Sequence, residues 1–203
     1  MEKRVVITGR GAVTPVGNTL AESWENIKAG KHGFAEITHF DIEPHKVKMG
    51  AEVKNFDFGD KRAAKRLDLS SQYALIAAEE AVTDSGIVSG ENVKAERFGV
   101  FGATGIGGIS TLESEVTKCV KKGTIARASA LLVPMVMPNA VAGNLAIKFS
   151  AKGPALEPYL PARRVPTELA KRSAISSMDM RMYCWPDLPN PSLLRYASLD
   201  LPT

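Results

Sequence analysis

Apolar runs and amphipathic segments alternate along residues 1–154, and glycine or proline bounds most of them. The β-branched run at residues 4–8 predicts a buried strand that ends in a turn at Gly9. The run at residues 97–102 predicts a second buried strand. Buried strands that alternate with helices are typical of an α/β fold, in which the glycine-rich turn after a strand lies at a functional edge of the sheet.

Several segments carry apolar residues at helical spacing. We expect helices at residues 20–29, 70–85, 111–122 and 140–150. Gly30 and Gly86 follow the first two at the position where glycine commonly ends a helix, and Asn139 offers a cap to the last. The helix at 70–85 is rich in alanine, which predicts that it packs closely against another element.

The segments between these elements lack a clear period. Residues 31–47 are expected to form a loop, and residues 50–58 a short edge strand with a turn. The apolar segment at 131–138 contains Pro134 and Pro138, which predict a loop because proline interrupts a regular helix.

The candidate metal ligands are scattered. His32, His39 and His45 are spaced by seven and six residues, which matches no compact metal-binding motif, so they are predicted to lie at the surface. Cys119 and Cys184 form no CxxC-type pair, so neither a metal site nor a redox dithiol is expected.

The glycines after the first run do not complete a nucleotide-binding motif. Gly9 and Gly11 match the start of the dinucleotide fingerprint, but Thr14 stands where its third glycine belongs. No Gly-Lys-Ser/Thr sequence follows, so a P-loop is excluded. A nucleotide-binding α/β protein therefore remains only as an alternative, which binding of NAD would identify.

Composition narrows the functional classes. The chain has 203 residues, of which 44% are hydrophobic and 24% charged, as in ordinary globular proteins. The net charge is only +4, and the basic runs have no flanking aromatic residues, so a nucleic-acid partner is not expected. No stretch reaches the 18 apolar residues of a membrane span, and no leader pattern precedes the first run. We therefore expect a cytoplasmic protein with no membrane partner.

Separated motifs carry a family resemblance. They are RVVITGRGAVTPVGNT, SWENIKAGKHG, RLDLSSQYALIAAEEAVTDSG, FGVFGATGIGGIS, PMVMPNAVAGNLAIKF and KGP, in this order. Together they resemble the N-terminal half of the β-ketoacyl-acyl-carrier-protein synthases, most closely the elongating synthase II branch. The resemblance spans residues 1–154 and leaves residues 155–203 outside it.

The resemblance implies a fold and a reaction. Family members have a thiolase-like α/β fold in which two similar halves form a five-layered sandwich, and they act as homodimers. They are acyltransferases of fatty acid biosynthesis, which condense an acyl thioester with malonyl-acyl-carrier protein after decarboxylation. The implied partners are acyl-carrier protein and the acyl and malonyl thioesters, and no cofactor is needed.

The resemblance also implies an acyl pocket. Ile106, between Gly105 and Gly107, matches the residue that gates this pocket in the family. Met135 and Val136 match a segment that lines the pocket near the dimer interface. No catalytic residue is expected, because no cysteine stands where the family's nucleophile follows the Gly-Pro pair, and the family's two histidines belong to the missing half. Cys184 lies between Tyr183 and Trp185 and lacks the small residues that form the sharp turn, or elbow, around the family's nucleophilic cysteine.

The resemblance stops after Pro154. No cysteine stands where the nucleophile is expected, and seven of the twelve prolines lie in the last 49 residues, so the tail is expected to be irregular. A reading frame shifted by one base takes the last base of each codon with the first two bases of the next. In this frame the codons of Pro161 and Ala162 together permit a cysteine, and the following codons permit Ala-Ser-Gly-Thr. The same frame requires valine at the junction of Met182 and Tyr183, which suits a later His-Gly-x-Ala-Asp-Val strand.

The sequence therefore favours a truncated, inactive condensing enzyme with a frameshifted tail. A non-catalytic partner subunit of a condensing enzyme is the alternative, although it would require a complete second half.

Overall fold

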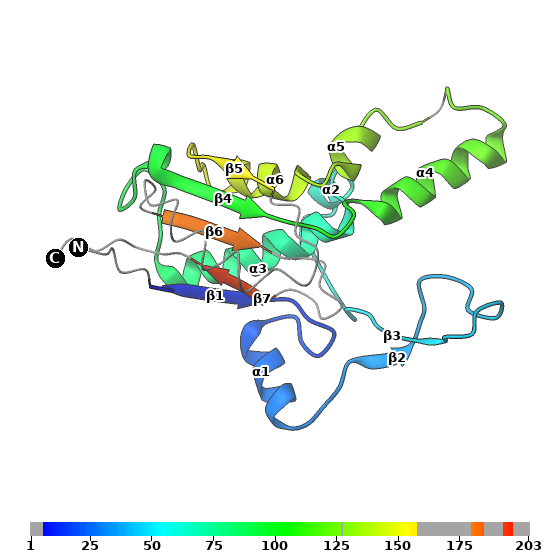
Figure 1. Ribbon diagram of the computed structural model, residues 1–203, viewed down its shortest axis with the longest axis horizontal. Helices are drawn as coiled ribbons and strands as arrows, with labels where there is room; N and C mark the ends of the chain where they lie inside the picture. Colours follow the sequence, from blue (N-terminus) through cyan, green and yellow to red (C-terminus); the bar gives the residue numbers. More distant parts are fainter. Residues whose placement is uncertain (1–5, 127, 158–179, 185–192, 197–203) are drawn as a thin grey trace.

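A mixed five-stranded sheet forms the centre of the protein in the computed structural model, which describes residues 6–126, 128–157, 180–184 and 193–196 (Figure 1). Its strands are β1 (Gly9–Ala12), β4 (Phe98–Gly102), β5 (Ala155–Leu156), β6 (Met180–Cys184) and β7 (Leu193–Tyr196), in the order β1-β7-β6-β4-β5. Strand β4 pairs in parallel with β5 and with β6. Strand β7 pairs antiparallel with β6 and with β1.

Helices cover one face of this sheet. Helices α3 (Leu69–Ser85) and α6 (Ala140–Lys148) lie side by side on it (Figure 1). The other helices are α1 (Leu20–Lys28), α2 (Lys61–Ala64), α4 (Ile109–Lys122), α5 (Leu132–Val136) and the 3-10 turn η1 (Ala95–Arg97). This layering of helices on a mixed sheet agrees with the expected α/β class.

The helix predictions are confirmed in place, with local signals at their ends. Thr19 caps α1 by accepting a hydrogen bond from the backbone N–H of Glu22. Gly30 and Gly86 take the left-handed conformation just after α1 and α3, at φ of 70° and 68°. Asn139 occupies the cap position of α6, but its side chain makes no capping hydrogen bond.

The first strand lies later than expected. Residues 6–8 are outside any strand, and β1 begins at Gly9, where a turn was predicted. A Cβ atom at Gly9 or Gly11 would lie well under 3.0 Å from a backbone carbonyl oxygen of α3. The glycines therefore serve a close approach of strand to helix and not a turn.

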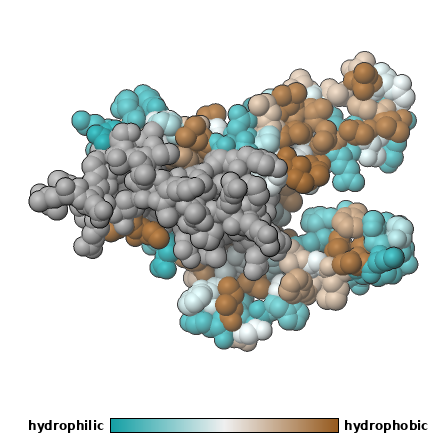
Figure 2. Space-filling model, in the orientation of Figure 1, coloured by the Kyte–Doolittle hydropathy of each residue, from teal (hydrophilic) through white to brown (hydrophobic). Residues whose placement is uncertain are grey.

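Two arms project from the sheet and its helices in Figure 1. One is a hairpin of β2 (Phe34–Glu36) and β3 (Met49–Ala51), which pair antiparallel. The prediction of a loop at residues 31–47 is thus wrong for β2, because pairing with a distant segment supplies hydrogen bonds that no local pattern announces. The other arm consists of α4 and α5, and hydrophobic residues gather on its surface in Figure 2.

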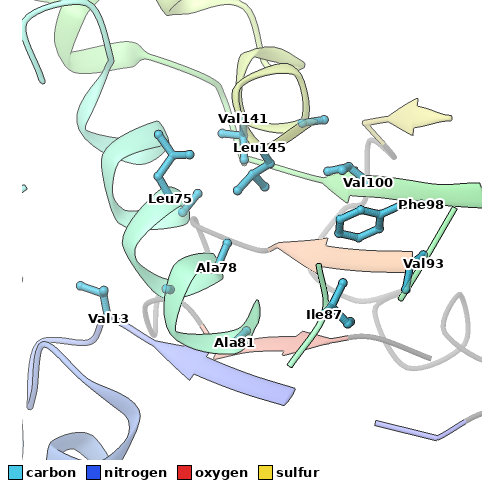
Figure 3. Packing of buried hydrophobic residues seen from close by; sticks show 13 residues of the cluster. Val13, Leu75, Ala78, Ala81, Ile87, Val93, Phe98, Val100, Val141 and Leu145 are labelled. Carbon is cyan, nitrogen blue, oxygen red and sulfur yellow. The ribbon is translucent and has the colours of Figure 1, made fainter. Parts of the chain in front are cut away.

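The core lies between α3, α6 and strand β4 (Figure 3). Phe98, Val100 and Leu145 are fully buried there, against the small alanine face of α3. The alanines of this face are Ala74, Ala77, Ala78 and Ala81. The prediction that the alanine-rich helix packs closely is confirmed, because small side chains let the helix approach strand and neighbouring helix.

The segment after Pro154 is not irregular where it is described. Strands β5, β6 and β7 all lie in it, so the expectation of an irregular tail is wrong for these residues. None of the three strands contains proline, and they pair with backbone groups of β4 and β1 that would otherwise stay open. The junction of Pro161 and Ala162 lies outside the described residues.

Candidate functional site

The candidate site is the glycine loop at residues 103–108, which leaves the end of the buried strand β4 and enters α4. The hydroxyl oxygen of the buried Thr104 accepts a hydrogen bond from the backbone N–H of Gly107. Gly107 has φ of 91°, in the left-handed region that favours glycine. The loop is therefore a tight turn that only glycine can make at this position.

The glycine loop lies directly against α5. The backbone N–H of Gly108 donates to the carbonyl oxygen of Val136 at 3.1 Å. A Cβ at Gly107 or Gly108 would lie well under 3.0 Å from the carbonyl oxygens of Val136 or Met135. The structure thus brings together the two segments that carry the predicted pocket residues, Gly105 to Gly107 and Met135 to Val136.

Ile106 lies at the open side of this loop. Its side chain is 67% exposed, so the described part of the chain does not enclose it. Met135 and Val136 are half-buried. The pocket-lining role of these residues remains a prediction, and a wall of a pocket would need a further surface opposite Ile106.

The loop predicted at residues 131–138 contains a helix. Helix α5 runs from Leu132 to Val136 and includes Pro134. The prediction failed because Pro134 lies in the first turn, where a backbone N–H has no partner within the helix and its loss costs nothing. The short helix is what places the carbonyl oxygens of Met135 and Val136 against the glycine loop.

Helix α4 presents an apolar stripe to solvent. Its members recur at helical spacing, are 41–74% exposed, and are Ile109, Leu112, Val116 and Val120. Glu115, in contrast, is buried and accepts hydrogen bonds from Lys118 Nζ at 2.6 Å and from the Ser129 backbone N–H at 3.0 Å. The hydrogen bond from Lys118, followed by that from Ser129, lowers the pKa of Glu115.

Positive charge gathers on and after α2. Lys61, Arg62, Lys65 and Arg66 are all exposed there, and none forms an ion pair with another described residue. Arg62 and Arg66 border a hollow of about 370 Å³, whose other lining residues are Asp60, Ala63, Leu67 and Asn144. This surface is suited to an acidic partner.

Titratable groups do not gather into a centre in the described residues. Across these ranges no group of three histidine, cysteine, aspartate or glutamate side chains could hold a metal ion. The three histidines are exposed, as predicted, and His39 lies 3.9 Å from Glu52. Burial, with the nearby charges of Glu52 and Asp68, raises the pKa of Tyr73 to about 12, which keeps this phenol neutral at physiological pH.

The described part of the chain contains no helix with the length and apolar character that crossing a membrane requires.

The sequence matches one family along most of its length. The family model for "Beta-ketoacyl synthase, N-terminal domain" covers residues 2–158. The 3-oxoacyl-[acyl-carrier-protein] synthase 2 of Staphylococcus aureus (strain COL) is 44% identical over 155 residues, which are 75% of this chain and 37% of that protein. The chain therefore spans little more than a third of the length of this curated relative.

Solved ketosynthases share the fold. The ishigamide ketosynthase/chain length factor superposes with a TM-score of 0.77 at 22% identity, over 92% of this chain and 48% of that one. A second similar structure is AntDE:AntF, a type II PKS acyl-carrier protein in complex with its ketosynthase. It superposes with a TM-score of 0.75 at 17% sequence identity, over 98% of this chain and 63% of that one. These likenesses support the thiolase-like fold expected from the sequence.

Proposed function

The chain belongs to the β-ketoacyl synthase family, and on this premise we propose that it is the N-terminal part of an elongating 3-oxoacyl-[acyl-carrier-protein] synthase. The observation that carries the proposal is the 44% identity to a synthase 2 over 155 residues. The complete enzyme would act in fatty acid synthesis in the cytoplasm. Its reaction moves an acyl group from the thiol of one carrier protein onto a cysteine, which frees that carrier protein. Malonyl-acyl-carrier protein then loses carbon dioxide, and the resulting carbanion attacks the acyl carbonyl carbon and displaces the cysteine thiolate.

In this proposal the described residues shape the acyl pocket and do not perform chemistry. Ile106 with Gly105 and Gly107 would form one part of its wall, and Met135 with Val136 the adjoining part. The contacts of Gly107 and Gly108 with α5 support this arrangement. Cys119 is on the solvated helix α4, far from any small-residue elbow, and is not proposed as a nucleophile.

The proposed carrier-protein surface is the basic cluster Lys61, Arg62, Lys65 and Arg66. Its charges are exposed and free of ion pairs within the described ranges, and in the AntDE:AntF assembly an acyl-carrier protein is in complex with its ketosynthase. Charge complementarity favours fast association of such a surface with an acidic carrier protein.

A second copy of the chain is proposed to cover the apolar stripe of α4. The stripe is continuous along the helix, and exposed apolar rows of this kind mark protein interfaces. The homodimer would place the Ile106 loop close to the subunit boundary, since the loop enters α4 directly.

The tail is proposed to be a frameshifted sequence, so that the chain as it stands is inactive. Strand β6 contains the junction of Met182 and Tyr183, where the shifted frame reads the valine of the Ala-Asp-Val strand. The support for the proposal is that the shifted frame permits the family's Cys-Ala-Ser-Gly-Thr and Ala-Asp-Val motifs at these junctions. The nucleotide sequence across the codons for Gly153 to Leu160 tests this proposal directly.

Activity is tested with two proteins, the 203-residue chain and a version with the reading frame restored. Each is incubated with acyl-acyl-carrier protein and malonyl-acyl-carrier protein, and the 3-oxoacyl product is measured. We expect product only from the restored protein. No product from the restored protein would reject the proposed activity, and product from the 203-residue chain would reject its inactivity.

The second candidate, a non-catalytic partner subunit, finds support in the chain length factor named for one structural neighbour. It predicts that the 203-residue chain copurifies with an active ketosynthase and alters its product length.

A further inference from the structure

Asp68 is a buried carboxylate at the junction of α3 and α4. Only 4% of the surface of Asp68 is exposed to solvent. One oxygen, Oδ1, accepts from the backbone N–H of Ser70 at 3.0 Å and from its hydroxyl at 2.8 Å. The other, Oδ2, accepts from the Thr111 hydroxyl at 2.6 Å and from the Thr111 backbone N–H at 3.3 Å.

These bonds make Asp68 the cap of two helices. Asp68 is the N-cap of its own helix, α3. Helix α4 starts after Gly108, which has no side chain to cap it, and Thr111 is its third residue. The first backbone N–H groups of a helix lack partners and carry partial positive charge, so a carboxylate stabilises them. One side chain thus fixes the starts of α3 and α4 relative to each other.

The same carboxylate limits where the glycine loop can lie. A Cβ at Gly108 would come within 3.0 Å of Asp68 Oδ2 on one side and closer still to the Met135 carbonyl oxygen on the other. Gly108 is therefore held between Asp68 and α5. Ile106 stands two residues before it, on a turn that Thr104 and Gly107 close.

We propose that Asp68 is a positioning residue, which fixes the Ile106 loop against α5 and thereby sets the length of acyl chain that the pocket accepts. The part of this inference that concerns chain length rests on the proposed function, because it needs Ile106 in the pocket wall. The part that concerns the loop rests on the hydrogen bonds of Asp68 alone.

Two substitutions weaken the bridge to α4 and leave α3 capped, and the longer bond from the backbone N–H of residue 111 is the part that Thr111→Val keeps. Asp68→Asn keeps a good N-cap for α3 but replaces one accepting oxygen with an amide NH₂. Thr111→Val removes the hydroxyl at nearly constant shape and leaves Asp68 intact. The controls are Thr111→Ser, which keeps a hydroxyl, and Asp60→Asn, because Asp60 caps only α2 through the Arg62 and Ala63 N–H groups.

Exchange is measured on the 203-residue chain, and probe binding on the protein with the reading frame restored, because Ile106 is 67% exposed in the 203-residue chain and the pocket needs an opposing wall. Amide hydrogen exchange of the peptide spanning residues 104–116 reports the loop and the start of α4. Dissociation constants for pyrenebutyrate and pyrenedodecanoate, measured by fluorescence, report the preferred chain length as their ratio. We expect Asp68→Asn and Thr111→Val to speed exchange about tenfold and to shift the ratio about threefold, and both controls to change neither.

Unchanged exchange in both test variants overturns the proposal. Faster exchange with an unchanged ratio also overturns it, because Asp68 would then be a helix cap and nothing more. If the unsubstituted protein with the restored frame binds neither probe, the acyl-pocket assignment fails together with the chain-length part, and the exchange data still decide whether Asp68 positions the loop.

Discussion

Gly11 lies against Ala77 so closely that no side chain fits between them. A Cβ atom on Gly11 would sit well under 3.0 Å from the carbonyl oxygen of Ala77 in α3. Strand β1 therefore reaches its place in the sheet only because this position is glycine.

Gly11→Ala is expected to destabilise the fold by about 3 kcal/mol, since either the strand or α3 must shift. The free energy of unfolding from urea titration measures the effect. Gly143→Ala is the matched control: nothing lies within 4 Å of the added Cβ in the middle of α6. There, the better helix propensity of alanine should stabilise the protein by about 1 kcal/mol. Equal effects of the two substitutions would contradict the proposed close approach.

Glu80 holds β1 to the start of α1. Its carboxylate accepts hydrogen bonds at 2.9 Å from the backbone N–H groups of both Ala12 and Leu20. Glu80→Gln replaces one of the two accepting oxygens, so we expect a loss of about 2 kcal/mol. Glu79→Gln on the same helix is the control, because the Glu79 side chain makes only an exposed pair with Lys148 at 3.5 Å. A change no larger than that of the control would show that Glu80 is dispensable.

Glu115 predicts a pH dependence of stability. Its pKa in the folded protein lies below the ordinary value of 4.5, chiefly because Lys118 donates a hydrogen bond to the charged form. The unfolded chain therefore takes up the proton first as pH falls. Glu115 therefore contributes to the free energy of unfolding above about pH 4.5, and this contribution is lost as the pH falls through the lowered pKa of the folded protein.

Urea titrations at pH 7 and at pH 4 measure this loss. In Glu115→Gln the difference between the two pH values should shrink, whereas Glu113→Gln, at an exposed position of the same helix, should leave it unchanged. An identical pH dependence in all three proteins would contradict the role of Glu115.

The apolar stripe of α4 predicts self-association. Leu112→Lys with Val116→Lys should shift the chain toward monomer in sedimentation velocity, because the charges interrupt the middle of the stripe. Val47→Lys removes another exposed apolar side chain, on the β2–β3 arm, and should leave the association state unchanged. A monomer before any substitution would reject the stripe as the interface of a homodimer.

Part of the candidate site could be predicted from the sequence. The family motifs pointed to Ile106 and to Met135 with Val136, and the structure brings their two segments into contact. Asp68 was not singled out as a site residue, because its role depends on Thr111, 43 residues later. An aspartate before a helix announces a cap in the sequence, but not a second helix that shares it.

The sequence by itself determined the four longer helices α1, α3, α4 and α6, but neither α2 nor α5. Thr19 and Gly30 bound α1, and Gly86 ends α3, because capping and left-handed glycine act within a few residues of the chain. The buried run at residues 97–102 also predicted β4, whereas only the tertiary structure decided where β1, β2, β6 and β7 lie. Strand β2 forms by pairing with β3, β1 is placed by the fit of Gly9 and Gly11 against α3, and β6 and β7 fill the sheet between β4 and β1. The hydrogen bonds and close backbone contacts of these strands join residues far apart in the chain, so no local pattern specifies their pairing.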